Sequence, residues 1–81
     1  MSGDERANET ERQLEALLFA AAEPLAVSDL AARLPEGADI EAGLAALQAR
    51  YEGRGVELAC VADSWRFQTA QDLAFLMTLE R

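Results

Sequence analysis

Several residue types that build reactive sites are missing or scarce in this 81-residue chain. It contains no histidine and one cysteine. Without histidine the chain lacks the commonest general base and metal ligand. Its one thiol, Cys60, has no partner for an internal disulfide, which suits the cytosol. Cys60 also falls on the apolar face of an expected strand, where we expect a buried structural residue rather than a nucleophile. We therefore expect no enzymatic activity, no bound metal and no cofactor.

Positive charge is scarce as well. Lysine is absent and seven arginines are scattered along the chain, which leaves a net charge of −8 and a pI near 4.3. Binding to nucleic acid requires a positive surface that displaces counterions from phosphates, and anionic membranes also attract basic segments. No apolar run approaches the roughly 18 residues of a membrane span, and no signal peptide opens the chain. We expect a cytoplasmic protein that binds neither a membrane nor a specific nucleic-acid sequence.

The composition is nevertheless that of one small folded domain, with 51% hydrophobic and 27% charged residues. Residues 1–8 are small, polar or charged, so we expect a disordered tail there and a single domain over residues 9–81. A domain of this size buries only about 60–65% of its unfolded surface. Such a domain gains stability from a partner.

Helices are expected in the first half of the chain. Asn8 and Glu11 have the spacing of a capping box, which predicts a helix beginning near Glu9, and Pro24 ends that helix. An extended piece over residues 25–27 should lead to a second helix capped by Ser28. Asp39 should cap a third helix, whose apolar stripe is Ile40, Leu44, Leu47 and Tyr51.

A hairpin and a last helix are expected in the second half. Residues 56–61 alternate in polarity, Asp63 and Ser64 suggest a tight turn, and residues 65–69 suggest the returning strand. Thr69 and Asp72 then resemble a capping box for a fourth helix that runs to about Leu79. The fold class is thus α+β and mostly helical: a winged helix-turn-helix with three helices, a two-stranded wing and a C-terminal helix.

The third helix is poorly equipped to read DNA, although winged helices often do so. A recognition helix presents Arg, Lys, Asn or Gln to base edges. The arc opposite the core stripe here holds only alanines: Ala42, Ala45, Ala46 and Ala49. Arg54 and Arg66 could form one weak phosphate-binding cluster, but two solvated arginines beside Glu57 and Asp63 are the favoured interpretation.

Large apolar residues remain after the core is assigned. On the first helix the core stripe centres on Leu14, Leu18 and Ala21, and Phe19 points away from it. On the last helix the expected core stripe is Leu73, Leu76 and Met77, so Phe75 and Leu79 lie on another face. A small monomer rarely exposes apolar groups on two faces of one helix. We expect a dimer or domain interface that includes Phe19, Trp65, Phe75 and Leu79, although Trp65 could instead complete the core.

Two runs of sequence resemble one protein family, segregation and condensation protein B. Residues Leu14–Leu25 are similar to its opening helix, where "EALLFA" leads to Glu and Pro-Leu. Residues Tyr51–Leu58 are similar to its second marker, and Trp65–Thr69 fit the wing that follows. The resemblance covers roughly Glu11 to Leu79. Ala22 departs from it, because the family often has Gly there.

The resemblance implies a non-enzymatic subunit of the bacterial condensin-like SMC–kleisin complex, which condenses and segregates chromosomes. In this family the N-terminal winged helix mediates homodimerisation. A second winged helix, which does not follow in this chain, helps to bind the kleisin, segregation and condensation protein A. Contact with the kleisin and the SMC ATPase would then belong to the full-length protein. The alternative is a DNA-binding winged helix of a transcription regulator.

Overall fold

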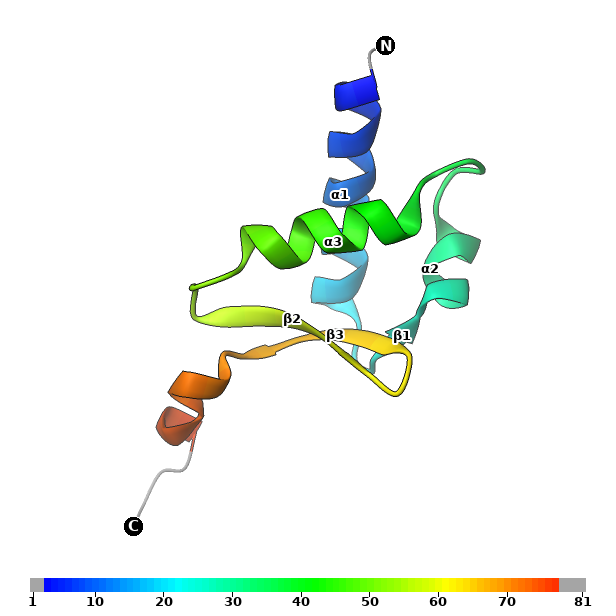
Figure 1. Ribbon diagram of the computed structural model, residues 1–81. Coiled ribbons are helices and arrows are strands. Elements are labelled where there is room, and N and C mark those ends of the chain that lie inside the picture. The colour runs from blue at the N-terminus through cyan, green and yellow to red at the C-terminus, as the bar shows by residue number, and fades with distance from the viewer. Residues whose placement is uncertain (1–2, 78–81) are drawn as a thin grey trace.

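A computed structural model describes residues 3–77 of the chain. Three helices stand over one face of a small antiparallel sheet, and a short final helix leaves the body at one corner (Figure 1). This is the winged-helix arrangement expected from the sequence. The wing gains a third strand, because the short extended piece after the first helix also pairs with it.

The first helix, α1, spans Gly3–Ala20 and is longer than predicted. The predicted start near Glu9 is therefore wrong, and residues 3–8 belong to the helix rather than to an irregular tail. Glu5 and Ala7 explain the extension, because both residue types favour helices and acidic groups near an N-terminus interact well with the helix dipole. The apolar spacing of α1 buries Leu14 and Leu18, which are 0% and 3% exposed.

Helix α2 spans Val27–Arg33 and follows strand β1, Leu25–Ala26. Ser28 is not its cap, contrary to prediction. The cap residue is Ala26, whose backbone N–H donates to the Asp29 carboxylate at 3.0 Å. The acidic side chain in the first turn thus reaches back to the cap residue's own N–H, which is the reciprocal half of a capping box. The helix buries Leu30.

Helix α3 spans Ile40–Arg50 and begins as predicted, with the Asp39 carboxylate accepting from the Ala42 N–H at 3.1 Å. The expected stripe faces inward, since Ile40, Leu44 and Leu47 are buried and Tyr51 is half-buried. These side chains form one core with the buried leucines of α1, α2 and the sheet. Burial of this apolar surface is the main force that holds the helices on the sheet.

The wing consists of β2, Val56–Val61, and β3, Ser64–Thr69, in the antiparallel order β1-β3-β2. The predicted turn is displaced by one residue: Ala62 and Asp63 form it, with φ of 53° and 66°, and Ser64 pairs with Val61. Positive φ at both central residues defines the type I′ turn that suits tight hairpins.

Cys60 is exposed, so the prediction of a buried thiol is wrong. It does share a strand face with Leu58, which is 2% exposed. However, Cys60 lies near the hairpin end, where it pairs with Trp65. The helices cover this face of β2 only around Leu58. The alternation of polar and apolar residues along the strand therefore identifies which face is apolar, but it does not show how far the core extends along that face.

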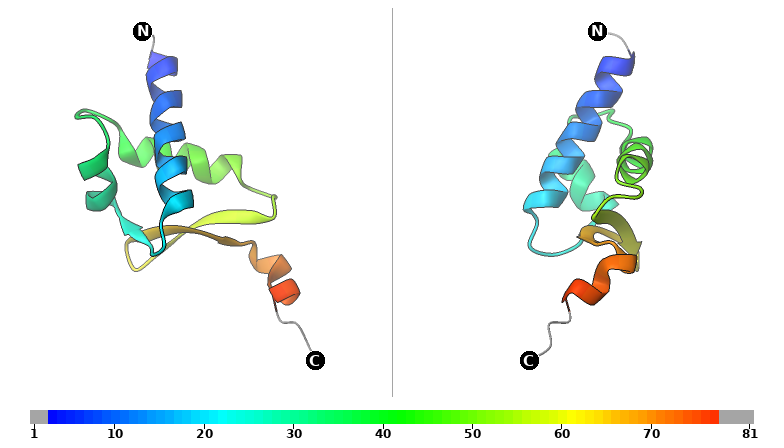
Figure 2. Two further views of the ribbon diagram at one scale, coloured as in Figure 1. Left: turned by 180° about the vertical axis from the view of Figure 1, so that it is seen from behind. Right: turned by 90° about the vertical axis from the view of Figure 1, so that its left-hand side faces the viewer.

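The last helix also differs from prediction. Residues Gln71–Met77 form a 3₁₀ helix, η1, where an α-helix was expected, and Leu79 lies outside the described residues. Of the expected core stripe, Leu73 is half-buried, whereas Leu76 and Met77 are 50% and 65% exposed. Both views in Figure 2 show η1 projecting away from the three-helix body, so little of it contacts the core. Short 3₁₀ segments are typical where tertiary packing is sparse.

Candidate protein interface

Phe19 is the most exposed large apolar residue of the described chain, at 84%. It follows Leu18, and successive helical residues point about 100° apart, so burial of Leu18 turns Phe19 outward. A phenylalanine that becomes buried in a complex contributes about 1.5–3 kcal/mol. Its exposure on a small domain is therefore a candidate signal for a partner.

A groove runs beside Phe19, between α1 and the wing. Its volume is about 690 Å³ and its walls are largely apolar. Ala16 and Phe19 line it from α1, and Val56, Phe67 and Thr69 line it from the two long strands. These residues are far apart in the sequence, so no local pattern could have predicted the groove.

The η1 segment carries the second exposed apolar group. Phe75, Leu76 and Met77 are 67%, 50% and 65% exposed. Phe75 was predicted as an interface residue, and its exposure is compatible with that prediction. Leu79 cannot be placed. Trp65 is half-buried and packs against the core, and its interface role stays a prediction.

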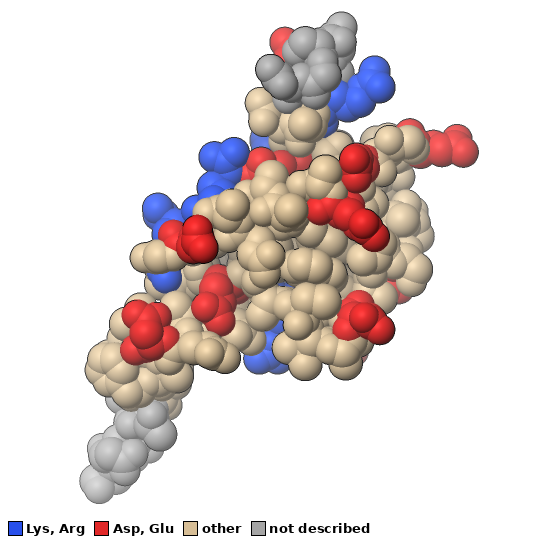
Figure 3. All heavy atoms as spheres, viewed as in Figure 1, with Lys and Arg blue, Asp and Glu red and all other residues tan. Residues whose placement is uncertain are grey.

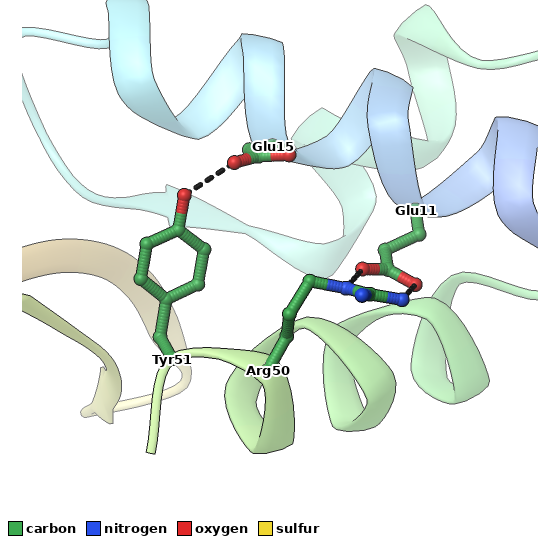
Figure 4. Close-up of polar contacts among 4 residues, drawn as sticks. All are labelled: Glu11, Glu15, Arg50 and Tyr51. Atoms are coloured by element: carbon green, nitrogen blue, oxygen red, sulfur yellow. Dashed lines mark hydrogen bonds and ion pairs between the residues drawn. The ribbon is translucent and has the colours of Figure 1, made fainter. Parts of the chain in front are cut away.

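Two polar contacts fix α1 against α3, next to the groove (Figure 4). Glu11, only 7% exposed, accepts from both Nε and a terminal nitrogen of Arg50. The Tyr51 hydroxyl donates to the Glu15 carboxylate. Both pairs join residues that are more than thirty positions apart in the chain. Sequence reasoning did not detect them, because charged residues on helix surfaces give no sign of their partners.

These contacts alter the acid–base properties of two groups. The hydrogen bond to Glu15, with burial and the carboxylate charge, raises the pKa of Tyr51 above its usual value of 10.0. The hydrogen bond and charge of Glu11 raise the pKa of Arg50. Both shifts favour the protonated forms, which are the forms that donate in these contacts.

The face of α3 that a DNA reader would present is apolar and small. Ala42, Ala45, Ala46 and Ala49 are all exposed, as predicted. Figure 3 shows mainly uncharged surface on this side, with acidic groups dispersed over it and basic groups mostly at its edge. Without hydrogen-bonding side chains, such a helix cannot distinguish base edges.

Arg54 and Arg66 do not form a compact pair. Arg66 lies opposite Ala59 in the sheet, whereas Arg54 precedes the start of β2 at Val56. The three residues from Ala59 to Val56 already span about 10 Å of strand. Arg66 instead donates to the Gln68 side chain at 3.3 Å, and Gln68 donates to Glu57 at 2.8 Å. The favoured interpretation of solvated arginines fits this arrangement.

Residues 3–77 show no sign of two other kinds of site. No group of three or more His, Cys, Asp or Glu side chains in this part of the chain could hold a metal ion. Within the same range, no helix has the length and apolar character needed to cross a membrane. The two exposed apolar groups and the groove are the distinctive surface features that remain.

Fold and surface together define a winged-helix domain whose third helix lacks the side chains of a DNA reader. A family model described as "Segregation and condensation complex subunit ScpB" matches residues 12–79. The chain belongs to the ScpB family. The resemblance of its two sequence runs to this family is thereby confirmed. A comparison with curated proteins found no match.

Three solved structures are similar to this chain. A conserved hypothetical protein from Chlorobium tepidum is 28% identical with a TM-score of 0.76, over 91% of this chain and 49% of that one. ScpB from Mycobacterium tuberculosis is 29% identical with a TM-score of 0.74, over 88% and 46%. A dimer of an ScpB N-terminal domain complexed with ScpA peptide is 28% identical with a TM-score of 0.72, over 86% and 91%. The chain thus spans about half the length of the first two.

Proposed function

We propose that this domain is the homodimerising winged helix of an ScpB subunit in a condensin-like SMC–kleisin complex, which condenses and segregates bacterial chromosomes. The observation that carries the proposal is the similarity to an ScpB N-terminal domain that is a dimer bound to an ScpA peptide. The match covers 91% of that chain, so the likeness extends over a whole domain.

The surface supports a role in protein contacts. Phe19 and the apolar end of η1 are exposed on a domain whose described core has only nine buried hydrophobic residues. A core this small provides only a few kcal/mol of stability, so burial of these residues in a dimer would add substantially to it. The domain acts by binding rather than by catalysis. Its partners are a second copy and, through the full-length protein, the kleisin ScpA and the SMC ATPase in the cytoplasm.

A DNA-binding regulator is not favoured. The net charge is −8, and the exposed arc of α3 consists of alanines. A titration with random duplex DNA at low salt should show no binding. Binding that weakens steeply as salt rises would instead support a DNA-binding role, because such dependence reports the release of counterions from phosphates.

Light scattering on a size-exclusion column tests the homodimer directly. The expected result is a dimer mass that persists on dilution from high to low micromolar protein. A monomer mass at every concentration would contradict the proposed homodimer. A second titration, with a synthetic peptide of the ScpA kleisin, should show binding by the dimer, and its absence would restrict this domain to dimerisation alone.

A further inference from the structure

We infer that the groove between α1 and the wing is filled by the η1 segment of a second copy, so that two copies exchange these segments around a two-fold axis. The inference rests on the proposed homodimer and names the surfaces that form it.

The groove has the character of a site for apolar side chains. Ala16, Phe19, Val56 and Phe67 line its apolar part, and polar or charged side chains, among them Arg12, Glu15 and Gln68, line the rest. Phe19 and Val56 are 84% and 42% exposed, so the walls are not closed by the chain itself. The volume of about 690 Å³ is in the range of sites that hold several large side chains.

The η1 segment has the complementary character. Leu76 and Met77 are adjacent and are half or more exposed, and Phe75 before them is 67% exposed. Successive side chains of a 3₁₀ helix point about 120° apart, so these three consecutive residues make the end of η1, here called the tip, apolar on all sides. Burial of such a tip in an apolar groove is favourable in proportion to the area that is removed from water.

The base of η1 is fixed in a direction that leads the tip away from its own body (Figure 1). Ala70 is 5% exposed, and its N–H donates to the Gly55 carbonyl at 2.9 Å. Leu73 donates to the Ala70 carbonyl at 2.9 Å, and its side chain packs beside Gly55. Turning η1 back over its own groove would break these contacts, whereas a second copy can supply its tip without breaking them.

A reciprocal exchange covers both apolar surfaces at once. In a two-fold dimer each tip meets the partner's groove, so neither surface stays exposed and the assembly is closed. A one-way contact would leave one groove and one tip free on every pair and would propagate into chains. Each copy carries a net charge of −8, so the apolar contact has to overcome mutual repulsion, and added salt should tighten the dimer.

The test uses one variant for each surface and a matched control. Ala16→Arg fills the groove at an exposed helical position, and Leu76→Asp makes the tip polar. Val61→Asp is the control, because Val61 is also an exposed apolar residue, at 64%, but lies at the hairpin end and does not line the groove. Circular dichroism checks that all three variants fold, and sedimentation equilibrium measures their self-association.

Ala16→Arg and Leu76→Asp should each weaken the dimer by at least about 100-fold, because each change removes a contact that occurs twice. Val61→Asp should dimerise like the parent chain. An equal mixture of the groove and tip variants should form a heterodimer only about 10-fold weaker than the parent dimer. In that heterodimer one intact tip still meets one intact groove, and a single contact of the two is lost.

The outcomes separate this inference from the homodimer itself. A parent chain that is monomeric contradicts the proposed homodimer. A parent dimer that tolerates Ala16→Arg or Leu76→Asp leaves the homodimer intact and overturns the exchange. Loss of the dimer in both variants without recovery in the mixture also overturns the exchange, because it shows that both surfaces act within one chain or that groove meets groove and tip meets tip.

Discussion

Replacement of Gly43 by alanine tests how closely α1 and α3 approach each other. A Cβ atom at this position would lie 2.6 Å from Leu14 Cδ1 and 3.2 Å from Thr10 Cγ2. Leu14 is 0% exposed and belongs to the packed core, so its terminal methyl group would have to shift against buried neighbours to make room. The glycine therefore allows the two helices to pack closer than a Cβ atom at this position would permit without a shift of Leu14.

Two effects of Gly43→Ala oppose each other. Alanine is the better helix former by about 0.5–1 kcal/mol in a helix interior. Overpacking in a well-packed core costs about 1–3 kcal/mol. Because the nearest contact falls below any normal Cβ distance, we expect overpacking to win and the free energy of unfolding to fall by about 1–2 kcal/mol. For a domain of this size the melting temperature would then drop by about 4–8 °C for each kcal/mol.

Urea unfolding followed by the fluorescence of Trp65, the one tryptophan in the chain, measures the effect. Ala45→Gly on the exposed side of α3 is the matched control. It changes helix propensity without touching α1 and should destabilise by about 0.5–1 kcal/mol. In a Leu14→Ala background the clash is relieved, so Gly43→Ala should there be neutral or stabilising. Equal or higher stability of Gly43→Ala in the parent chain would refute the close approach of the two helices.

Three further predictions concern the contacts around the core. The raised pKa of Tyr51 contributes stability that is present below pH 10 and is lost as pH rises through the higher pKa of the folded state. The parent chain should therefore lose stability above pH 10 more steeply than Tyr51→Phe. Tyrosinate absorbance, which reports only this residue, should place the titration above 10.0. Arg50→Ala should destabilise the domain more than Glu11→Ala, because only the former leaves a buried carboxylate without its partner; a larger loss for Glu11→Ala in urea unfolding would contradict this. The double variant Ala62→Asn, Asp63→Gly should raise the free energy of unfolding by about 1 kcal/mol in thermal unfolding, because both positions have positive φ and Asn-Gly suits a type I′ turn. Unchanged stability would argue against that turn.

Local signals in the sequence predicted most of the fold. Helical spacing identified Leu14, Leu18, Leu44 and Leu47 as core residues, and all four are buried. Asp39 caps α3 as its residue type and position indicated. Such signals act over a few residues and depend little on what packs above them, which is why they can be read from one sequence.

Boundaries and chain ends were predicted less well. The start of α1 moved from Glu9 to Gly3, the cap of α2 moved from Ser28 to Ala26, and the last helix is a 3₁₀ segment. Several residues near each boundary could serve as caps, and the choice between them depends on small differences in free energy. The spacing of the apolar residues in η1 predicted an α-helix with one buried stripe, but the described residues of the chain provide no surface against which that stripe could be buried.

The sequence by itself determined the order of the elements, the buried stripe of each long helix, the absence of a DNA-reading face on α3 and the membership of the ScpB family. Each of these follows from residue identity and short-range spacing. Only the tertiary structure decided that Cys60 is exposed, that Gly43 lies against Leu14, that Glu11 binds Arg50 and that a groove opens beside Phe19. These features depend on how segments distant in the chain pack together, and spacing along one segment carries no information about what another segment brings to it.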